Sequence, residues 1–507
     1  MTKTRLRPFA AALLAAIVAA GCAAKVVPQV SAVPTLTAFE QKMRWILQLE
    51  DARQLRAVEG GDLVALLQDA EARVRRRAAL AAGRVGLAEA VEPLAALMRL
   101  DADREVRQMG AFALGLIGDP SAVDALLAEL GGADALLQGR AAEALGMIAH
   151  KPAAAAIGAM VAAHVGAGVL AGIAPDDMAT RREESIEALR LGTYALVRLE
   201  AYDALAAAFL DSDGQPRSRW WPVAYAFQRI NDPRAVPALL AFLQGEGQLT
   251  RAFAARGLGV AKAPAALTPL LAIVGNPAEP QAVRVQAIRA IAAIGDVAGA
   301  GTLVRVITTD QADPNVRLEA VTALGLLKAP AALDLLIDLA SSSWPSMRAA
   351  ALTALSRVDV DIFVTALSSL SPDEHWSVRA ALASAVADLG RERAEAPLTR
   401  MLGDADQRVV PSVLAGLAKV GAANAATIML THLEADDPVV RAAAARGLGV
   451  LKATGVTAAL TEAVARAARD GLYVARAAAL DALVAIDPQA ARPVLTSALI
   501  DKDWAVR

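Results

Sequence analysis

Along most of the chain, apolar residues recur every three or four positions, which is the spacing of one face of an α-helix. In the stretch DPVVRAAAARGLGVLKATGV, the apolar positions Val440, Ala444 and Leu448 fall on one such face. Asp437 stands where a helix start is capped, and Gly455 stands where a turn is needed. The stretch therefore predicts one amphipathic helix with a defined beginning and end.

A second apolar stripe follows after a short turn. Its spacing of i, i+3, i+4 and i+7 is clearest in Val123, Leu126, Leu127 and Leu130. Neither stripe has a partner within its own unit large enough to cover it, so neighbouring units must stack. We predict an all-α solenoid, a superhelical rod one repeat thick and roughly 100–130 Å along its curved axis at ~8–10 Å per helix layer.

The dipeptide Val-Arg marks the units. Within two runs of the chain, neighbouring marks lie 31 to 33 residues apart, which is a repeat signature. Counting in this way predicts about thirteen two-helix units between residues 71 and 500. The marks are Val74-Arg75, Val106-Arg107, Val283-Arg284, Val316-Arg317, Met347-Arg348, Val378-Arg379, Val409-Val410, Val440-Arg441 and Val506-Arg507.

The repeated motif D-x-x-V-R-x-x-A-x-x-A-L-G, met at 313–327 and 373–389, resembles the HEAT repeat. It is most similar to the short bacterial type first named for phycobilisome lyases, and the resemblance covers nearly all of the mature chain. The resemblance implies an α-solenoid built of HEAT-like repeats. It implies almost nothing about function, because one fold serves many functions.

The first residues have the layout of a secretory signal peptide. Three basic residues precede an apolar run at 9–20, and small residues and Cys22 follow. The apolar run is too short for a good membrane span. Cleavage before Cys22 would leave 48 basic and 53 acidic residues, a net charge of −5. This mild acidity gives no electrostatic case for binding nucleic acid.

The residues Ala19-Ala20-Gly21-Cys22 resemble the bacterial lipobox, although Ala19 replaces the usual Leu. The resemblance implies lipidation of Cys22, and Ala23 implies sorting to the outer membrane, facing the periplasm. An ordinary cleaved signal beside a stray thiol is the alternative. Cys22 is the only cysteine, so neither an intramolecular disulfide nor a cysteine metal cluster can form.

These observations divide the chain into five parts. We expect a signal peptide at 1–21, the lipidated Cys22 and a linker at 22–35, N-terminal capping helices at 36–70, the repeat array at 71–500 and the start of a further, incomplete repeat at 501–507.

Candidate chemistry is sparse. The four histidines, His150, His164, His375 and His432, are scattered over different units without metal-ligand spacing, so we expect surface or turn residues. The run beginning at Asp211 opens like a calcium loop but has Pro222 where a bidentate Glu is required, and we read it as a turn. We expect no catalytic residue, no cofactor and no metal.

The arginines of the Val-Arg marks could form a basic ladder for an anionic partner. In several units an Asp stands three residues before the mark Val, such as Asp313 before Val316, and instead offers the Arg a neighbour across the stack, as does Asp437. We favour this structural role. The arginines concerned are Arg75, Arg107, Arg284, Arg317, Arg348, Arg379 and Arg441.

Two places depart from the repeat. The segment 161–183 is long and rich in Gly, and the units around Tyr194 and Trp220-Trp221 match poorly. We expect bends or exposed loops there, and we name Trp220 and Trp221 as possible partner contacts. Drifted repeats that only alter curvature are the alternative. A further three tryptophans, each three or four residues before a mark Arg, are expected to cover helix entrances as hydrophobic staples: Trp344, Trp376 and Trp504.

A lipid-anchored scaffold is the function that the sequence favours. It would bind a protein along a concave surface lined by second helices, such as those expected at 332–340 and 425–433. The alternative is the substrate-presenting arm of a longer periplasmic cyclophilin-type prolyl isomerase whose catalytic domain would follow Arg507. A bilin lyase, the literal meaning of the family name, is opposed by the export signal because that chemistry is cytoplasmic.

Overall fold

The computed structural model describes residues 37–57, 61–179, 182–309, 313–369 and 372–507. In these ranges the chain is built of α-helices, and β-pairing is limited to two isolated bridges, Arg56 with Asp62 and Leu210 with Pro216. The predicted signal peptide, Cys22 and the whole predicted linker at 22–35 lie outside the described residues. None of the described helices combines the length and apolarity needed to cross a bilayer.

Two helices precede the repeats. Helix α1 (Ala38–Asp51) begins with a capping box in which Thr37 and Glu40 exchange side-chain to backbone hydrogen bonds. Ile46 and Leu49 of α1 are buried. The four-residue helix α2 (Leu63–Leu66) then leads into the array.

Thirteen consecutive helix pairs follow in the described part of the chain, which confirms the predicted all-α solenoid of about thirteen units. The first helices are α3 (Ala72–Val85), α5 (Arg104–Ile117), α7 (Ala135–Met147), α9 (Glu184–Arg198), α11 (Trp221–Arg229), α13 (Gln248–Val260), α15 (Gln281–Ile294), α17 (Pro314–Leu326), α19 (Pro345–Val358), α21 (Trp376–Ala387), α23 (Val410–Val420), α25 (Pro438–Leu451) and α27 (Val474–Ile486). The second helices are α4 (Val91–Leu100), α6 (Val123–Glu129), α8 (Ala154–Gly166), α10 (Tyr202–Phe209), α12 (Val236–Leu243), α14 (Leu267–Gly275), α16 (Ala300–Thr308), α18 (Leu333–Leu339), α20 (Val360–Ser369), α22 (Arg391–Met401), α24 (Ala425–His432), α26 (Thr457–Ala467) and α28 (Pro488–Ala498).

Helix α25 shows how the sequence produces one unit. The Asp437 side chain accepts a hydrogen bond of 2.7 Å from the Val439 N–H, and a proline occupies the first helical position. Val440, Ala444 and Leu448 are fully buried, as the periodicity predicts. The apolar stripe is therefore buried between packed helices.

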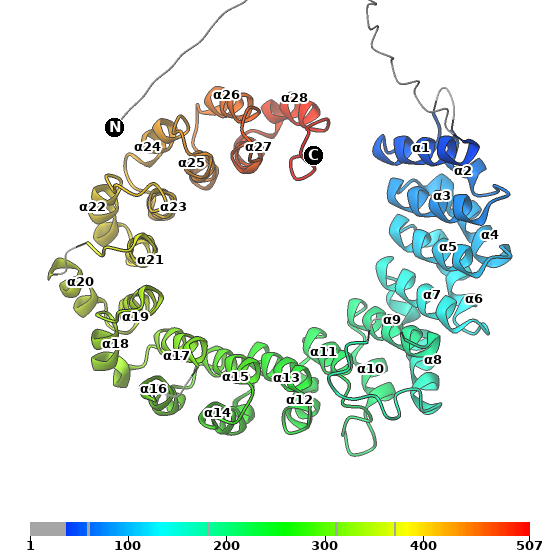
Figure 1. Ribbon diagram of the computed structural model, residues 1–507, viewed down its shortest axis with the longest axis horizontal. Helices are drawn as coiled ribbons and strands as arrows, with labels where there is room; N and C mark the ends of the chain where they lie inside the picture. Colours follow the sequence, from blue (N-terminus) through cyan, green and yellow to red (C-terminus); the bar gives the residue numbers. More distant parts are fainter. Residues whose placement is uncertain (1–36, 58–60, 180–181, 310–312, 370–371) are drawn as a thin grey trace, which may run out of the picture.

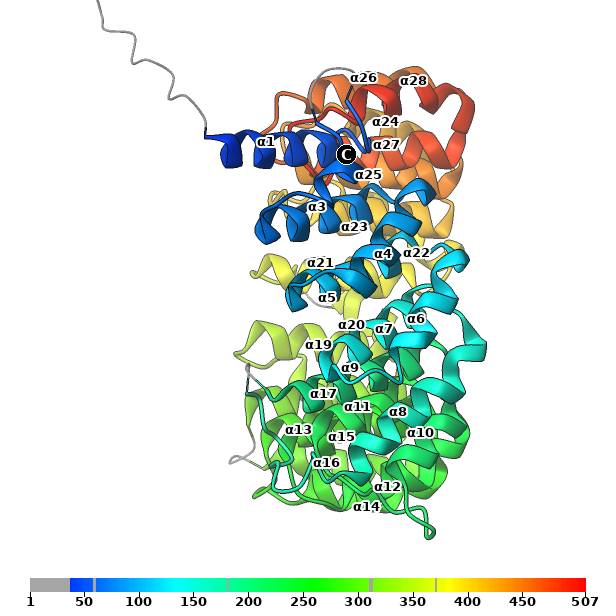
Figure 2. The same ribbon diagram turned by 90° about the vertical axis from the view of Figure 1, so that its right-hand side faces the viewer.

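The array curves into an open ring, one helix pair thick, rather than a rod (Figure 1, Figure 2). The first helices of the pairs line the inside of the ring, and the second helices form its outside. The expectation that α18 and α24 line the concave surface is therefore wrong. Both helices of a pair have a buried stripe, and the stripe alone does not tell which helix takes the inner side.

Close contacts between small residues explain the curvature. A Cβ added to Gly83, Gly115, Gly259 or Gly325 would lie 2.6–2.8 Å from the Cα of an Ala in the next first helix. Only Gly allows the two backbones to come this close. Successive first helices pack tightly through these contacts, so the stack bends toward them.

Candidate protein-binding surface

An aromatic cluster lies on three neighbouring inner helices, α9, α11 and α13. It consists of Tyr194, Trp221, Tyr225 and Phe253, all partly exposed. Ring centroids are 5.6 Å apart for Tyr194 and Tyr225, 5.3 Å for Tyr225 and Phe253, and 5.9 Å for Trp221 and Phe253. Edge-to-face and offset pairs of this kind stabilise each other. The four rings form one continuous surface across three repeats.

Aromatic residues are concentrated in this part of the molecule. The chain has only 6 Trp, 4 Tyr and 8 Phe, and half of them lie within residues 194–253. Four of these, Phe209, Trp220, Phe227 and Phe242, are buried and fill the core. The members within 194–253 are Tyr194, Tyr202, Phe209, Trp220, Trp221, Tyr225, Phe227, Phe242 and Phe253.

Charged side chains flank the cluster on one side. The Arg190 guanidinium lies 5.3 Å from the Tyr194 ring centroid and pairs with Glu187 at 2.5 Å. This pairing lowers the pKa of the Glu187 carboxyl and raises the pKa of Arg190, while burial raises the pKa of the Tyr194 hydroxyl. One helix further on, Arg140 repeats the arrangement over the ring of Phe112 at 5.7 Å. Partly exposed aromatic side chains thus lie on α5, α9, α11 and α13, with arginines on α7 and α9.

The irregular segment between α8 and α9 docks against the ends of α11 and α13. The Asp176 carboxylate accepts hydrogen bonds from the N–H groups of Gln248 at 2.5 Å and Leu249 at 2.9 Å. The helix α13 has no side-chain cap of its own, because Gly247 is its N-cap residue. The backbone N–H of Trp221 donates a hydrogen bond to the Pro175 carbonyl at 2.8 Å. We call the described residues of this segment, 167–179 and 182–183, the clasp. The clasp contacts two later repeats.

The clasp also fixes both tryptophans that the sequence singles out. The indole N–H groups of Trp220 and Trp221 donate to the Asp177 carbonyl at 3.3 and 3.0 Å. Arg182 pairs with Asp177 and lies 4.6 Å from the Trp220 ring centroid. Trp220 is only 1% exposed and has almost no surface to offer a partner. Trp221 is partly exposed, and the structure places it in the aromatic cluster.

The arginine ladder is made of structural ion pairs. Arg75, Arg348 and Arg379 each hold both carboxylate oxygens of an Asp in the following unit at 2.6–2.9 Å. Each also donates to the backbone carbonyl six residues before it. The structural role is as expected, but the partner is the Asp 25 or 26 residues later. The Asp three residues before the mark Val, such as Asp437 before Val440, caps its own helix instead.

The remaining sequence candidates have local roles. Asp211 accepts from the N–H groups of Asp213 and Gln215 and forms a turn. His164 is half-buried beside Gln138 at 2.9 Å, so it is not a surface residue. Trp344 and Trp376 pack against the core at helix entrances, whereas Trp504 is 79% exposed. In the described ranges, no group of three His, Cys, Asp or Glu side chains could hold a metal ion.

Sequence comparison with known families matches two kinds of repeat. A family described as HEAT repeats matches residues 276–356 and 364–449, and one described as PBS lyase HEAT-like repeat matches 106–132 and 223–245. The protein carries HEAT repeats. One matched stretch begins within α11 and includes Tyr225 of the aromatic cluster. No curated protein matches the chain.

Several solved structures resemble this HEAT-repeat protein weakly. Human deoxyhypusine hydroxylase in complex with glycerol is 17% identical over 51% of this chain and 97% of its own, with a TM-score of 0.25. The complex of CpcE and CpcF of phycocyanin lyase from Nostoc sp. PCC7120 is 21% identical over 60% and 98%, with a TM-score of 0.22. Kap121p is 10% identical over 87% and 64%, with a TM-score of 0.39. Structural similarity at these TM-scores does not indicate a function for this protein.

Proposed function

We propose that this HEAT-repeat protein is a scaffold without chemistry of its own that holds another protein against its inner surface. The observation that carries the proposal is the aromatic cluster on α9, α11 and α13. Tyr, Trp and Arg are the residues most enriched in the energetic centres of protein interfaces. Here they gather on the concave side of a chain that is otherwise poor in aromatic residues.

The cluster is also preorganised. Trp221 is held by its indole and backbone hydrogen bonds to the clasp, and Tyr225 is held between Tyr194 and Phe253. Side chains fixed before binding lose little conformational entropy when a partner docks. The paired charges of Arg190 and Glu187 would form part of a polar rim. A protein partner fits this combination of a rigid aromatic centre and a charged border.

Site-specific photo-crosslinking in intact cells tests the inner surface. A crosslinking residue at Tyr225 should give an adduct of discrete mass with one protein. The same residue at Asp334, an exposed position on the outer helix α18, should give none. Equal adducts from both positions, or adducts from Asp334 alone, would contradict binding on the inside.

The partner recovered in this way can then be purified and titrated. Tyr225→Ala and Trp221→Ala should each weaken its affinity at least tenfold, because a truncated interface centre typically costs about 2 kcal/mol or more. Tyr473→Ala is the matched control, since Tyr473 is 41% exposed and far from the cluster in the chain. If Tyr225→Ala and Tyr473→Ala have the same small effect, the cluster is not the contact.

We also propose that a lipid on Cys22 anchors the scaffold at the outer membrane, facing the periplasm. The proposal is supported by the signal-like start and the lipobox resemblance of residues 19–22. Mass spectrometry of the membrane-extracted protein should give an N-terminal Cys22 carrying acyl groups. Cys22→Ser should release the protein from the membrane fraction, and an unchanged distribution would contradict the anchor.

A further inference from the structure

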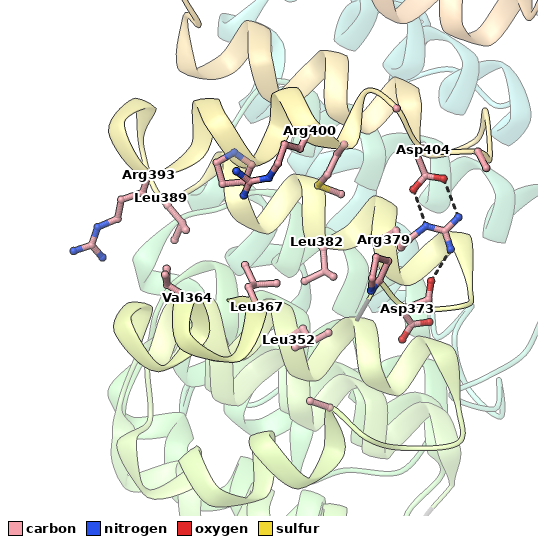
Figure 3. A pocket seen from close by; sticks show the side chains of 16 residues that line it. Leu352, Val364, Leu367, Asp373, Arg379, Leu382, Leu389, Arg393, Arg400 and Asp404 are labelled. Atoms are coloured by element: carbon pink, nitrogen blue, oxygen red, sulfur yellow. Dashed lines mark hydrogen bonds and ion pairs between the residues drawn. The ribbon is translucent and has the colours of Figure 1, made fainter. Parts of the chain in front are cut away.

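A surface pocket lies between the outer helices α20 and α22, apart from the aromatic cluster. It has a volume of about 700 Å³. Its lining comes from four successive helices, α19 to α22, and from the turn after α21. The apolar residues that line it are Leu352, Leu367, Leu382, Leu389 and Met401. Figure 3 shows the leucines turned toward the space between the two helix pairs. We call this pocket the leucine groove.

One end of the leucine groove is closed by charges that already satisfy one another. Arg379 holds both oxygens of Asp404 at 2.7 and 2.9 Å and donates to the Asp373 carbonyl at 2.6 Å (Figure 3). The Asp373 carboxylate is occupied by Arg348 at 2.7 Å. This end therefore offers no free charge to a ligand.

Two further arginines of α22 border the groove, and only one of them has an ion-pair partner. Arg393 pairs with Asp361 at 3.0 Å and extends away from the leucines in Figure 3. The Arg400 side chain is exposed and, among the described residues, its guanidinium makes no hydrogen bond or ion pair. The groove thus combines an apolar floor with one uncompensated positive charge at its rim.

The volume and lining of the groove fit a small-molecule site. Such sites have volumes of roughly 300–1,000 Å³ and are mostly apolar with a few placed polar groups. The leucine groove has these dimensions and this lining.

From these observations we propose that the leucine groove binds a free single-chain amphiphile of the fatty-acid class. The alkyl chain lies along the leucines, and the carboxylate pairs with Arg400. Charge complementarity selects this ligand, because a neutral chain leaves Arg400 without a partner and a cationic one is repelled by it. The site is independent of the inner surface and would make the scaffold sensitive to free fatty acids.

Calorimetric titration of the purified full chain with dodecanoate, below the concentration at which dodecanoate forms micelles, tests the proposal. We expect one dodecanoate per chain and at least tenfold weaker binding of dodecyltrimethylammonium, which has the same chain and the opposite charge. Arg400→Gln should weaken dodecanoate binding about two- to fivefold, as expected for one exposed ion pair. Arg446→Gln removes another exposed arginine, one whose guanidinium has no hydrogen-bond or ion-pair partner among the described residues, and should change nothing.

Filling the groove gives a second test. Leu382→Trp and Leu367→Trp, on different helices, should each abolish dodecanoate binding while circular dichroism shows an unchanged helical content. Both residues are only partly buried, so at least one variant is expected to fold.

Four results would overturn the proposal. They are the absence of dodecanoate binding by the wild type, equal binding of the cationic amphiphile, wild-type affinity in a folded Trp variant, and binding only to phosphatidylglycerol vesicles. A dimer that either Trp variant disrupts would show instead that a second copy occupies the groove.

Discussion

At the scale of single residues, the same side-chain types serve different purposes according to their place in the unit. Asp437 caps its own helix, whereas Asp373 and Asp404 bind the ladder arginine of the preceding unit. Ladder arginines such as Arg75, Arg348, Arg379 and Arg441 therefore join two repeats with charge-assisted hydrogen bonds. Arg284 is an exception, because its guanidinium donates to the Val274 carbonyl at 2.9 and 3.2 Å and burial lowers its pKa.

Replacing a ladder aspartate should make the array less stable and less sensitive to acid. Hydrogen bonds from Arg348 hold the pKa of the Asp373 carboxyl below its ordinary value. A lowered folded-state pKa adds stability above pH ~4, and this stability is lost as the pH falls through the folded pKa. Asp373→Asn should therefore cost about 1–2 kcal/mol at pH 7 and progressively less below pH ~4.

Urea unfolding of Asp373→Asn between pH 3 and pH 7 measures this difference. Asp338→Asn, at an exposed position of α18, is the control and should remain close to the wild type throughout. A stability difference that stays constant down to pH 3 would show that the carboxylate charge is not what the ladder uses.

One glycine substitution separates close packing from helix propensity. A Cβ on Gly325 would lie 2.6 Å from the Ala354 Cα, whereas one on Gly301 would meet nothing closer than 3.9 Å. Gly325→Ala should cost about 1–3 kcal/mol through overpacking. Gly301→Ala on the outer helix α16 should instead stabilise by about 0.5–1 kcal/mol. Thermal unfolding of the two variants should shift in opposite directions, and two shifts of the same sign would contradict this account.

At the scale of whole elements, the clasp is the clearest departure from the repeat. It supplies a helix cap across 72 residues of sequence, from Asp176 to Gln248. The regular units need no such help, because an Asp placed at the start of helices such as α5, α17 and α25 caps them locally. The clasp thus compensates for Gly247 at the start of α13 and holds Trp221 in the aromatic cluster.

Removing the borrowed cap should destabilise α13 locally. Asp176→Ala is expected to cost about 1 kcal/mol, the usual value of a lost N-cap. Hydrogen exchange should increase at the amides of Gln248 and Leu249, which lose their acceptor. Asp338→Ala, at an exposed position near the C-terminal end of α18, should leave both amides unchanged. Unchanged protection in Asp176→Ala would mean that the clasp does not cap α13 in solution.

At the scale of the whole molecule, periodicity alone predicted the helices, their pairing and the approximate number of units. Val440 and Val123 are buried as their spacing requires. The sequence could not predict which helix of a pair lies on the inside of the ring. That choice depends on contacts between units, such as Gly325 with Ala354. The sequence also did not predict that the residues of the clasp and of the aromatic cluster lie together. Their members come from irregular units, and only the partly exposed Trp221 was named among the candidates.

The ring shape itself is open to test. If Gly–Ala contacts between inner helices set the curvature, lengthening them should open the ring. A Cβ on Gly115, Gly259 or Gly325 would lie 2.6–2.7 Å from an Ala Cα, whereas ordinary contact begins at 3.4 Å. The inner helices must therefore move apart at each substituted position while the outer helices stay in place. The triple variant Gly115→Ala, Gly259→Ala, Gly325→Ala should then be less curved, with a wider gap between α1 and α28.

Small-angle X-ray scattering of the triple variant measures this change, because a more open arc has a larger radius of gyration and a longer maximum dimension. Gly301→Ala adds a methyl group on the outside of the ring and should leave both quantities unchanged. Should the triple variant prove too unstable, each single variant should still give a smaller increase. A folded triple variant with the wild-type radius of gyration would show that the curvature is set elsewhere, by the side chains between the outer helices.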